Sequence, residues 1–207
     1  MESSDLEPQK PPKQTSKKPA LLLLVLSVIG IICIVALVVT LAPRIKLPSF
    51  ALTPAKTTPG YYRVTEVYDG DTIAVNMDGR TEKVRMIGVD TPETHKPNSP
   101  VECGGPEASD FSKTTLSGAE VRLEADPTNQ NRDRYDRLLR YVYLPDGRLF
   151  NELLITEGYG TPYTSFPFQK KQEFIAAGLA AKIANKGVWA GICKVEDQNG
   201  RFKTNAL

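Results

Sequence analysis

This 207-residue sequence has no excess of positive charge between residues 61 and 193. Between residues 61 and 193 there are 16 lysines and arginines against 19 aspartates and glutamates, a formal balance of −3. A protein that coats nucleic acid without cutting it relies on many lysine and arginine contacts to phosphates, so this balance argues against that class. Any contact with a polyanion is therefore expected to be local and assisted by a metal ion.

Histidine is scarce, and no internal repeat is visible. The single histidine, His95, is interpreted as a loop residue, because one isolated histidine is a weak sign of catalysis. We expect one globular domain over residues 61–193. No feature indicates an obligate dimer or a protein partner, so the domain is expected to be monomeric.

Charge is absent altogether from residues 20–42, a run of 23 residues. A helix of that length crosses a bilayer core of roughly 30 Å, so the run predicts a transmembrane helix. Two alternatives fit less well. A cleaved signal peptide normally has a shorter apolar core, and a buried core helix normally has one polar face.

The segments around this run divide the rest of the chain. Residues 1–19 are rich in proline, lysine and serine and predict a disordered cytoplasmic tail. More lysines precede the run than follow it, which places the N-terminus in the cytoplasm and the C-terminal domain outside the cell membrane. Residues 43–60 predict an extracellular, proline-rich linker, and residues 194–207 a flexible C-terminal tail.

The domain itself shows an α+β pattern dominated by strands. Residues 61–89 alternate apolar and polar side chains, with a hairpin turn expected at Asp78-Gly79. Further strands are predicted at 120–126 and 137–148, and helices at 106–118, 149–160 and 168–185. The last helix contains Phe174, Ile175, Leu179 and Ile183. Five strands with a helix after the third predict a five-stranded barrel of the OB type.

Two aspartates occupy the ends of neighbouring predicted strands. Asp71 follows a break at Asp69-Gly70, and Asp90 follows the second strand, residues 83–89, which the hairpin places beside the first strand. Two carboxylates with a nearby carbonyl and water form a hard oxygen site that suits Ca²⁺ better than Zn²⁺. The alternative is that these are turn residues, and for Asp69 we adopt that interpretation.

An arginine-rich stretch, "NRDRYDRLLR", begins at residue 131. It holds Arg132, Arg134, Arg137 and Arg140, with Tyr135 among them. Guanidinium groups match phosphate oxygens with paired hydrogen bonds, and an aromatic ring stacks on a base. A solvated loop whose charges are balanced by Asp133 and Asp136 is the alternative.

Six motifs in one order resemble the staphylococcal nuclease-like, or thermonuclease, family. They are "DGDT" (69–72), "VRMIGVDTPE" (84–93), "GPEAS" (105–109), "DRYDR" (133–137), "DGRLFNELLITEGYG" (146–160) and "KGVW" (186–189). The resemblance covers residues 64–189. It implies an OB-fold barrel with three α-helices and a Ca²⁺-dependent nuclease that hydrolyses phosphodiester bonds of DNA and RNA.

The resemblance also assigns roles to residues. It implies metal binding by Asp71, Asp90 and the carbonyl of Thr91, and catalysis by Arg85, Glu93 and Arg137. Arg134 and Tyr135 would contact a phosphate of the substrate. Pro92 would keep Thr91 out of helical geometry and hold Glu93 within reach of a metal-associated water.

The sequence departs from the family pattern in two places. The family often has glycine just before the second arginine, where this chain has Asp136, whose charge is expected to pair with Arg134 or Arg137. The segment "TPYTSFPF" aligns poorly and leaves open whether Tyr163 or Phe166 stacks on a base.

Two cysteines bracket the domain, and an extracellular location favours their oxidation. We therefore expect a disulfide between Cys103 and Cys193, the alternative being two free thiols. Cys33 lies in the apolar run and is interpreted as a small apolar residue.

The leading hypothesis is thus a membrane-anchored, extracytoplasmic Ca²⁺-dependent nuclease. The alternative is a non-catalytic OB-fold module that binds nucleic acid or protein at the cell surface. A surface adhesion domain is disfavoured, because adhesion gives no reason for the full set of carboxylates and arginines.

Overall fold

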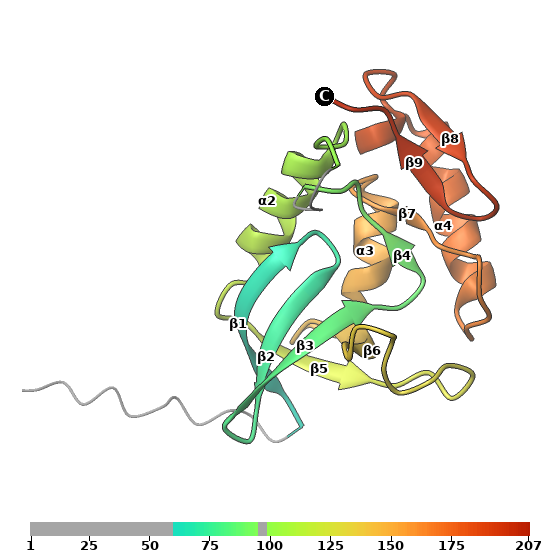
Figure 1. Cartoon of the computed structure of the whole chain (residues 1–207). Coiled ribbons are helices and arrows are strands. Elements are labelled where there is room, and N and C mark those ends of the chain that lie inside the picture. The colour runs from blue at the N-terminus through green and yellow to red at the C-terminus, as the bar shows by residue number, and fades with distance from the viewer. Residues whose placement is uncertain (1–59, 95–98) are drawn as a thin grey trace, which may run out of the picture. The chain divides into compact units, whose positions relative to one another are not determined.

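The computed structural model of the chain describes residues 60–94 and 99–207 (Figure 1). The expected cytoplasmic tail and membrane span, and all of the linker except Gly60, lie outside these residues. In the part that is described, no helix is both long and apolar enough to cross a membrane.

The centre of the domain is the predicted five-stranded closed barrel, with neighbouring strands in the order β1, β2, β3, β6 and β5 (Figure 1). Its strands are β1 (Tyr62–Asp69), β2 (Thr72–Met77), β3 (Arg80–Met86), β5 (Glu120–Glu124) and β6 (Leu138–Tyr143). Alternate apolar side chains of these strands point inward and are buried, including Ile73, Val75 and Val84. The period-two pattern of the sequence therefore produced the core that it predicted.

Two tight turns set the register of the first three strands. Met77 pairs with Arg80 across the expected turn at Asp78-Gly79, whose residues both have a positive φ, of 51° and 85°. Asp69 pairs with Thr72 across the other turn, which contains Gly70 and Asp71. The barrel closes through parallel pairing of β3 with β6. Asp71 consequently lies at one end of the barrel.

The described residues contain the three expected α-helices, α2 (Gly105–Leu116), α3 (Phe150–Thr156) and α4 (Lys171–Ile183). Shorter elements are β4 (Val89–Asp90), β7 (Thr161–Pro162) and the 3-10 helix η1 (Gly187–Trp189). Helix α2 begins with Pro106 in its first turn, where a missing N–H costs nothing. Its Ser112 hydroxyl donates to the carbonyl of Gly70 at 2.6 Å, which fixes the turn that carries Asp71.

Helix α4 buries a different face from the one its large apolar residues suggest. Phe174 is fully buried, whereas Ile175, Leu179 and Ile183 are 40%, 59% and 73% exposed. Residues four apart share a helix face, so these three isoleucine and leucine side chains lie together on the outside. The inner face is formed by Phe174 with the small residues Ala177, Gly178 and Ala181.

Buried Asn151 ties helix α3 to the barrel. Its side-chain carbonyl accepts from the N–H of Val142 at 2.9 Å, and its amide donates to the carbonyl of Ile87 at 2.9 Å. A buried polar group needs such partners, because leaving one unpaired costs about 1–3 kcal/mol. The asparagine of "LFNELL" therefore has a structural role.

Gly158 and Gly187 give a structural reason for two of the six motifs, "DGRLFNELLITEGYG" and "KGVW". A Cβ atom built at Gly158 would lie 2.3 Å from the carbonyl oxygen of Lys186, and one built at Gly187 would lie 2.2 Å from that of Gly158. Both contacts are with backbone, which cannot move aside. The end of α3 and the start of η1 therefore touch backbone to backbone.

The last residues form a hairpin instead of the expected flexible tail. Strand β8 (Val195–Asp197) pairs antiparallel with β9 (Phe202–Thr204) across a turn at Asn199-Gly200. The Cys103–Cys193 disulfide that the sequence predicted lies just before β8, with a Cα–Cα distance of 5.6 Å. The ring of Trp189 packs edge-on against Phe202, with 5.6 Å between ring centroids.

Candidate functional site

Arg85 joins the two predicted metal carboxylates. It lies on β3, beside the turn that carries Asp71 and five residues before Asp90. Its Nη1 forms an ion pair with Asp71, and its Nη2 lies 2.7 Å from Oδ1 of Asp90. The sequence prediction that neighbouring strands bring Asp71 and Asp90 together at one barrel end is therefore fulfilled by the fold.

This cluster is almost entirely withdrawn from solvent. Asp71 and Asp90 are 5% and 4% exposed. Burial lowers the pKa of the Arg85 guanidinium, the negative charge of Asp90 opposes that effect, and the positive charges of Arg137 and Arg201 add to it. An arginine starts from so high a pKa that the group stays a cation at neutral pH.

Thr91 orients Asp71 through two donors. Its backbone N–H lies 3.0 Å and its hydroxyl 3.2 Å from Oδ2 of Asp71, while the Thr72 hydroxyl lies 3.0 Å from Oδ1. These bonds fix the direction of the Asp71 carboxylate. The predicted role of the Thr91 carbonyl as a metal ligand remains a prediction.

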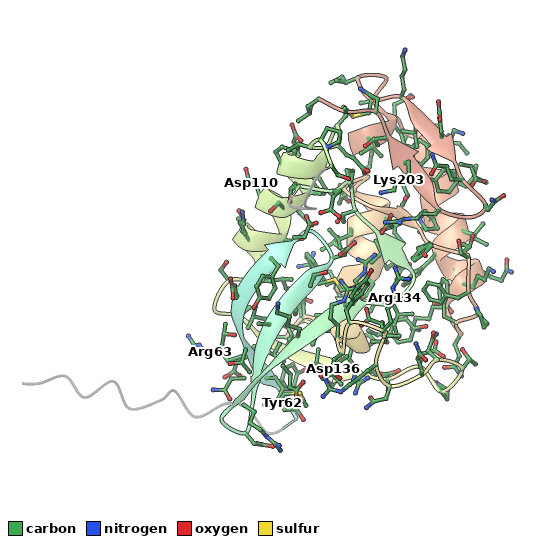
Figure 2. The ribbon with its side chains drawn as sticks, viewed as in Figure 1. Tyr62, Arg63, Asp110, Arg134, Asp136 and Lys203 are labelled. Carbon is green, nitrogen blue, oxygen red and sulfur yellow. A yellow bond between two sulfur atoms is a disulfide. The ribbon has the colours of Figure 1, made fainter. Side chains whose placement is uncertain are left out.

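Glu93 lies at the rim of this cluster, held by its backbone. Its N–H donates to Oε2 of Glu102 at 3.1 Å, and its carbonyl accepts from the N–H of Glu102 at 2.9 Å. Glu102 in turn pairs with Lys203 of β9 at 2.9 Å, and Figure 2 shows Lys203 on that strand. The segment that carries the candidate general base is thus fixed by two hydrogen bonds to Glu102.

Asp69 has more than the turn role that the sequence suggested. Its Oδ1 does accept from the N–H of Gly70 at 2.8 Å, as in a turn, and also from the hydroxyl of Thr94 at 3.1 Å. Burial and the nearby charge of Glu93 raise the pKa of Asp69 to about 6, against these two hydrogen bonds. The available signal was the motif "DGDT", in which Asp69 stands two residues before Asp71 and so at the same end of the barrel.

The loop before β6 carries the second group of predicted site residues. The Asp133 carboxylate accepts from the backbone N–H groups of Tyr135 and Arg137 at 2.9 and 3.0 Å, and it also pairs with the Arg137 guanidinium. Arg134 donates to the Tyr135 hydroxyl at 2.7 Å and lies over its ring. Tyr135 is 64% exposed, so this end of the loop faces solvent.

Asp136 pairs with a different arginine from those expected. Its carboxylate lies 3.6 Å from Nε of Arg132, and its carbonyl accepts from Nη1 of the same residue at 2.7 Å. The expected pairing with Arg134 or Arg137 is wrong, because Arg137 pairs with Asp133 and Arg134 donates to the Tyr135 hydroxyl instead. Arg134 and Asp136 both lie on the loop that precedes β6 (Figure 2).

The donor set fits a hard divalent cation. Asp71 and Asp90 both pair with Arg85, through different nitrogens of its guanidinium, and carboxylate oxygens are the ligands that a hard divalent cation prefers. Among the described residues no cluster of three or more acidic, histidine or cysteine side chains is suited to a metal. Further ligands would therefore have to be backbone oxygens or water.

The sequence interpretation missed one arginine. Arg201, in the hairpin turn before β9, lies with Nε 2.6 Å from Oδ2 of Asp90 and Nη2 3.1 Å from Oδ1. Burial lowers the pKa of Arg201, but its hydrogen bonds to Asp90 and the charge of Asp90 raise it by more. The Asn-Gly turn in "QNGR" was the available signal, since this pair favours a hairpin.

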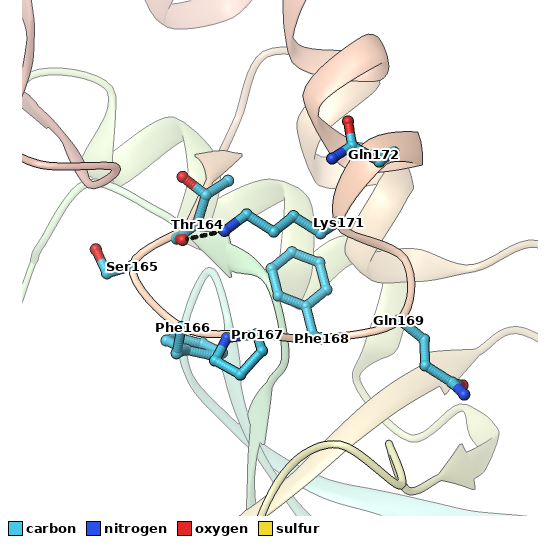
Figure 3. Close-up of a pocket in the computed structure, with 8 residues that line it drawn as sticks. All are labelled: Thr164, Ser165, Phe166, Pro167, Phe168, Gln169, Lys171 and Gln172. Atoms are coloured by element: carbon cyan, nitrogen blue, oxygen red, sulfur yellow. Dashed lines mark hydrogen bonds between the residues drawn. The ribbon is translucent and has the colours of Figure 1, made fainter.

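A surface pocket of about 460 Å³ is lined in part by the poorly aligned segment, residues 161–168. It is lined by Thr164, Ser165, Phe166, Pro167, Phe168, Gln169, Lys171 and Gln172. Figure 3 shows the Lys171 ammonium group donating to the carbonyl of Thr164, at 2.7 Å. The ring of Phe166 also contacts Tyr163 edge-on, with centroids 4.9 Å apart. Both candidates for base stacking thus lie side by side.

Comparison with known proteins agrees with this geometry. Residues 83–191 match the family model described as staphylococcal nuclease homologue. The chain is 42% identical over 165 residues to the thermonuclease of Staphylococcus hyicus, covering 78% of this chain and 96% of that protein. It is 52% identical over 97 residues to the thermonuclease of Staphylococcus intermedius, covering 47% of this chain and 56% of that protein. It is also 46% identical over 145 residues to the SPbeta prophage-derived endonuclease YokF of Bacillus subtilis (strain 168), covering 67% of this chain and 48% of that protein.

Proposed function

Because this chain belongs to the staphylococcal nuclease family and is a nuclease hydrolase, we propose that it hydrolyses phosphodiester bonds of DNA or RNA with Ca²⁺ as cofactor. The single observation that carries this proposal is the contact of Arg85 with both Asp71 and Asp90. It gathers a phosphate-binding cation and two oxygen ligands at one buried point. A binding module without catalysis would not need this arrangement.

The cofactor has a place in the donor set. Asp71 and Asp90 would hold the ion, with the Thr91 carbonyl as a further ligand. When bound, Ca²⁺ would supply Lewis acidity that polarises a phosphoryl oxygen. The donors from Thr91 and Thr72 keep Asp71 aimed in one direction, which spares that side chain a loss of freedom on binding.

The remaining residues act on substrate and water. Arg85 and Arg137 would bind the scissile phosphate and stabilise the charge that grows on it as a fifth oxygen approaches phosphorus. Glu93 would accept the proton of the attacking water or orient that water. Arg134 and Tyr135 lie farther out and would contact a neighbouring phosphate.

The site is tested by cleavage of a quenched fluorescent single-stranded DNA by the full chain in millimolar Ca²⁺ and in EGTA. Glu93→Gln and Arg85→Ala are expected to lower the rate by about 100-fold or more. Glu157→Gln is the matched control, because the Glu157 side chain is 41% exposed and pairs only with Lys186 among the contacts described. DNA binding without cleavage in any divalent metal would contradict the proposal.

We further propose that residues 20–42 anchor the chain in the cell membrane, with the nuclease domain outside. The proposal rests on the uncharged run of 23 residues and on the lysines that precede it. Extraction of membranes with alkaline carbonate should leave the chain in the pellet. Protease added to intact cells should remove the domain, and its protection would contradict the orientation.

A further inference from the structure

The C-terminal hairpin β8–β9 is fixed beside the candidate site from one side by the segment before α2. The Cys103–Cys193 disulfide joins the two covalently. The N–H of Cys103 donates to the carbonyl of Asn205 at 2.8 Å, and the N–H of Leu207 donates to that of Val101 at 2.9 Å. The hairpin is therefore part of the domain's framework.

The turn of the hairpin is held from the other side by the segment that follows β7. The N–H of Thr164 donates to the carbonyl of Gly200 at 2.7 Å, and the Ser165 hydroxyl donates to that of Asn199 at 2.9 Å. Arg201 comes directly after this turn. Its backbone position is thus determined on both sides, and its side chain projects onto Asp90.

Arg201 lies on the solvent side of the carboxylate cluster. Its side chain is 38% exposed, whereas those of Arg85 and Asp90 are 11% and 4% exposed. The ring of Tyr163 lies 5.4 Å from its guanidinium carbon and supports it from the side. A polyanion that approaches the cluster from solvent would meet Arg201 before Arg85.

The chemistry of Arg201 suits a phosphate. A guanidinium group that holds both oxygens of a carboxylate presents the same fork to two phosphate oxygens. Arg137 and Arg201 both lie close enough to Arg85 for their charges to act on it. Arg85 also holds Asp90, so any other cation that binds Asp90 must compete with a guanidinium.

We propose that Arg201 is a third phosphate-binding arginine of the site, which exchanges its ion pair with Asp90 for a phosphate group of the nucleic-acid substrate. This inference rests on the proposed nuclease function. It adds to it a residue outside the family match, which ends at residue 191. The hairpin is then a substrate-binding element that lies beyond the barrel.

The test measures binding of a fluorescein-labelled single-stranded oligonucleotide to the full chain carrying Glu93→Gln, in Ca²⁺, at several KCl concentrations. Adding Arg201→Gln should weaken binding about tenfold and reduce the slope of log K against log salt by about 0.7, the loss of one phosphate contact. Arg201→Lys should keep the slope and weaken binding less. Arg148→Gln, in which an exposed arginine paired with Asp146 is changed, should alter neither quantity.

The same substitutions in the chain with Glu93 intact give a second readout. Arg201→Gln should raise KM for the oligonucleotide by a similar factor, with a smaller change in kcat. An unchanged KM and an unchanged salt slope would overturn the inference. So would tighter Ca²⁺ binding by calorimetry without any change in DNA affinity, because Arg201 would then be only the counter-ion of Asp90.

The two levels of proposal fail in different ways. If the unmodified chain neither cuts nor binds the oligonucleotide, the proposed function fails and this inference fails with it. If the unmodified chain cuts the oligonucleotide but Arg201→Gln has the same KM and salt slope, only this inference fails. Thermal midpoints of Arg201→Gln and Arg201→Lys within a few degrees of the parent would show that both variants are folded.

Discussion

Asp133 forms an ion pair with Arg137 through one carboxylate oxygen, Oδ2, which lies 2.7 Å from Nε and 2.6 Å from Nη2 of the guanidinium. Arg137 is a predicted phosphate-binding residue, and its side chain is only 27% exposed. The pair therefore sets the direction in which the guanidinium points. We therefore expect Asp133 to act as a positioning residue for Arg137.

This relationship predicts the effect of Asp133→Asn. The substitution keeps the size of the side chain but removes the charge that orients Arg137, so kcat should fall about tenfold while Arg137→Gln loses about 100-fold or more. Steady-state kinetics on single-stranded DNA would measure both. Asp146→Asn is the matched control, because Asp146 grips exposed Arg148 in the same way, at 2.8 and 2.7 Å. Equal activity of the two asparagine variants would contradict the positioning role.

Asp136→Gly should stabilise the domain. Asp136 has a φ of 63°, a conformation that costs most side chains about 1 kcal/mol or more and glycine almost nothing. Its carboxylate is 88% exposed and lies 3.6 Å from Nε of Arg132, which is a long ion pair. Removing the carboxylate should therefore cost little stability. Urea denaturation should show a gain of about 0.5–1 kcal/mol. Asp136→Ala keeps the Cβ atom and should show no gain, and an equal gain from alanine would assign the effect to charge.

The Asp126–Tyr141 pair should make stability depend on pH at both extremes. Burial raises the pKa of Asp126, but hydrogen bonds from Thr128, Tyr141 and Gln169 lower it by more, so the net pKa lies below its ordinary value. Burial and the 2.5 Å bond to Asp126 raise the pKa of Tyr141.

The sign of each effect follows from linkage. A depressed carboxyl pKa gives stability that is present above about pH 4 and is lost as pH falls through the folded-state pKa. A raised tyrosine pKa gives stability that is present below about pH 10 and is lost as pH rises further. Tyr141→Phe should flatten the alkaline loss in thermal melts from pH 3 to 11. An unchanged alkaline slope would mean that Tyr141 is not the group responsible.

Removing the disulfide should destabilise the domain strongly. Cys103 and Cys193 are 90 residues apart, and the chain-entropy treatment of such a loop gives about 4.6 kcal/mol. Guanidinium denaturation of the double variant Cys103→Ser/Cys193→Ser would measure the loss. Dithiothreitol should bring the unmodified chain to the same midpoint and leave the double variant unchanged. If dithiothreitol leaves the denaturation midpoint of the unmodified chain unchanged, the disulfide contributes little to stability.

The barrel and the inner part of the site were predictable because their signals are local. Alternating side chains and an Asp-Gly turn define the first hairpin, and that hairpin brings Asp71 beside Arg85 through simple register. Asp90 follows Arg85 closely along the chain. Short-range pattern thus suffices for the contacts that Arg85 makes.

The contact of Arg201 with Asp90 could not be predicted in the same way. The two residues are 111 positions apart, and strands β8 and β9 are three residues long with no buried apolar face. The hairpin is held by backbone hydrogen bonds, a disulfide, an aromatic contact, two ion pairs and the hydroxyl of Ser165, none of which leaves a periodic pattern. Which face of α4 is buried could not be predicted from the sequence for a related reason. Most residues of its buried face are alanine or glycine, which give a weak hydrophobic pattern.

The contact between Gly158 and Gly187 has a consequence for how this protein can change over generations. A side chain at Gly158 would meet the backbone of Lys186 and Gly187, and one at Gly187 would meet the backbone of Gly158, so neither can be accommodated by shrinking the other glycine, which is already the smallest residue. No compensating second substitution exists within the pair. A saturation library would therefore show both positions intolerant, independently of each other and of the substrate used for selection, while Tyr135, which is 64% exposed, would tolerate change whenever folding alone is selected.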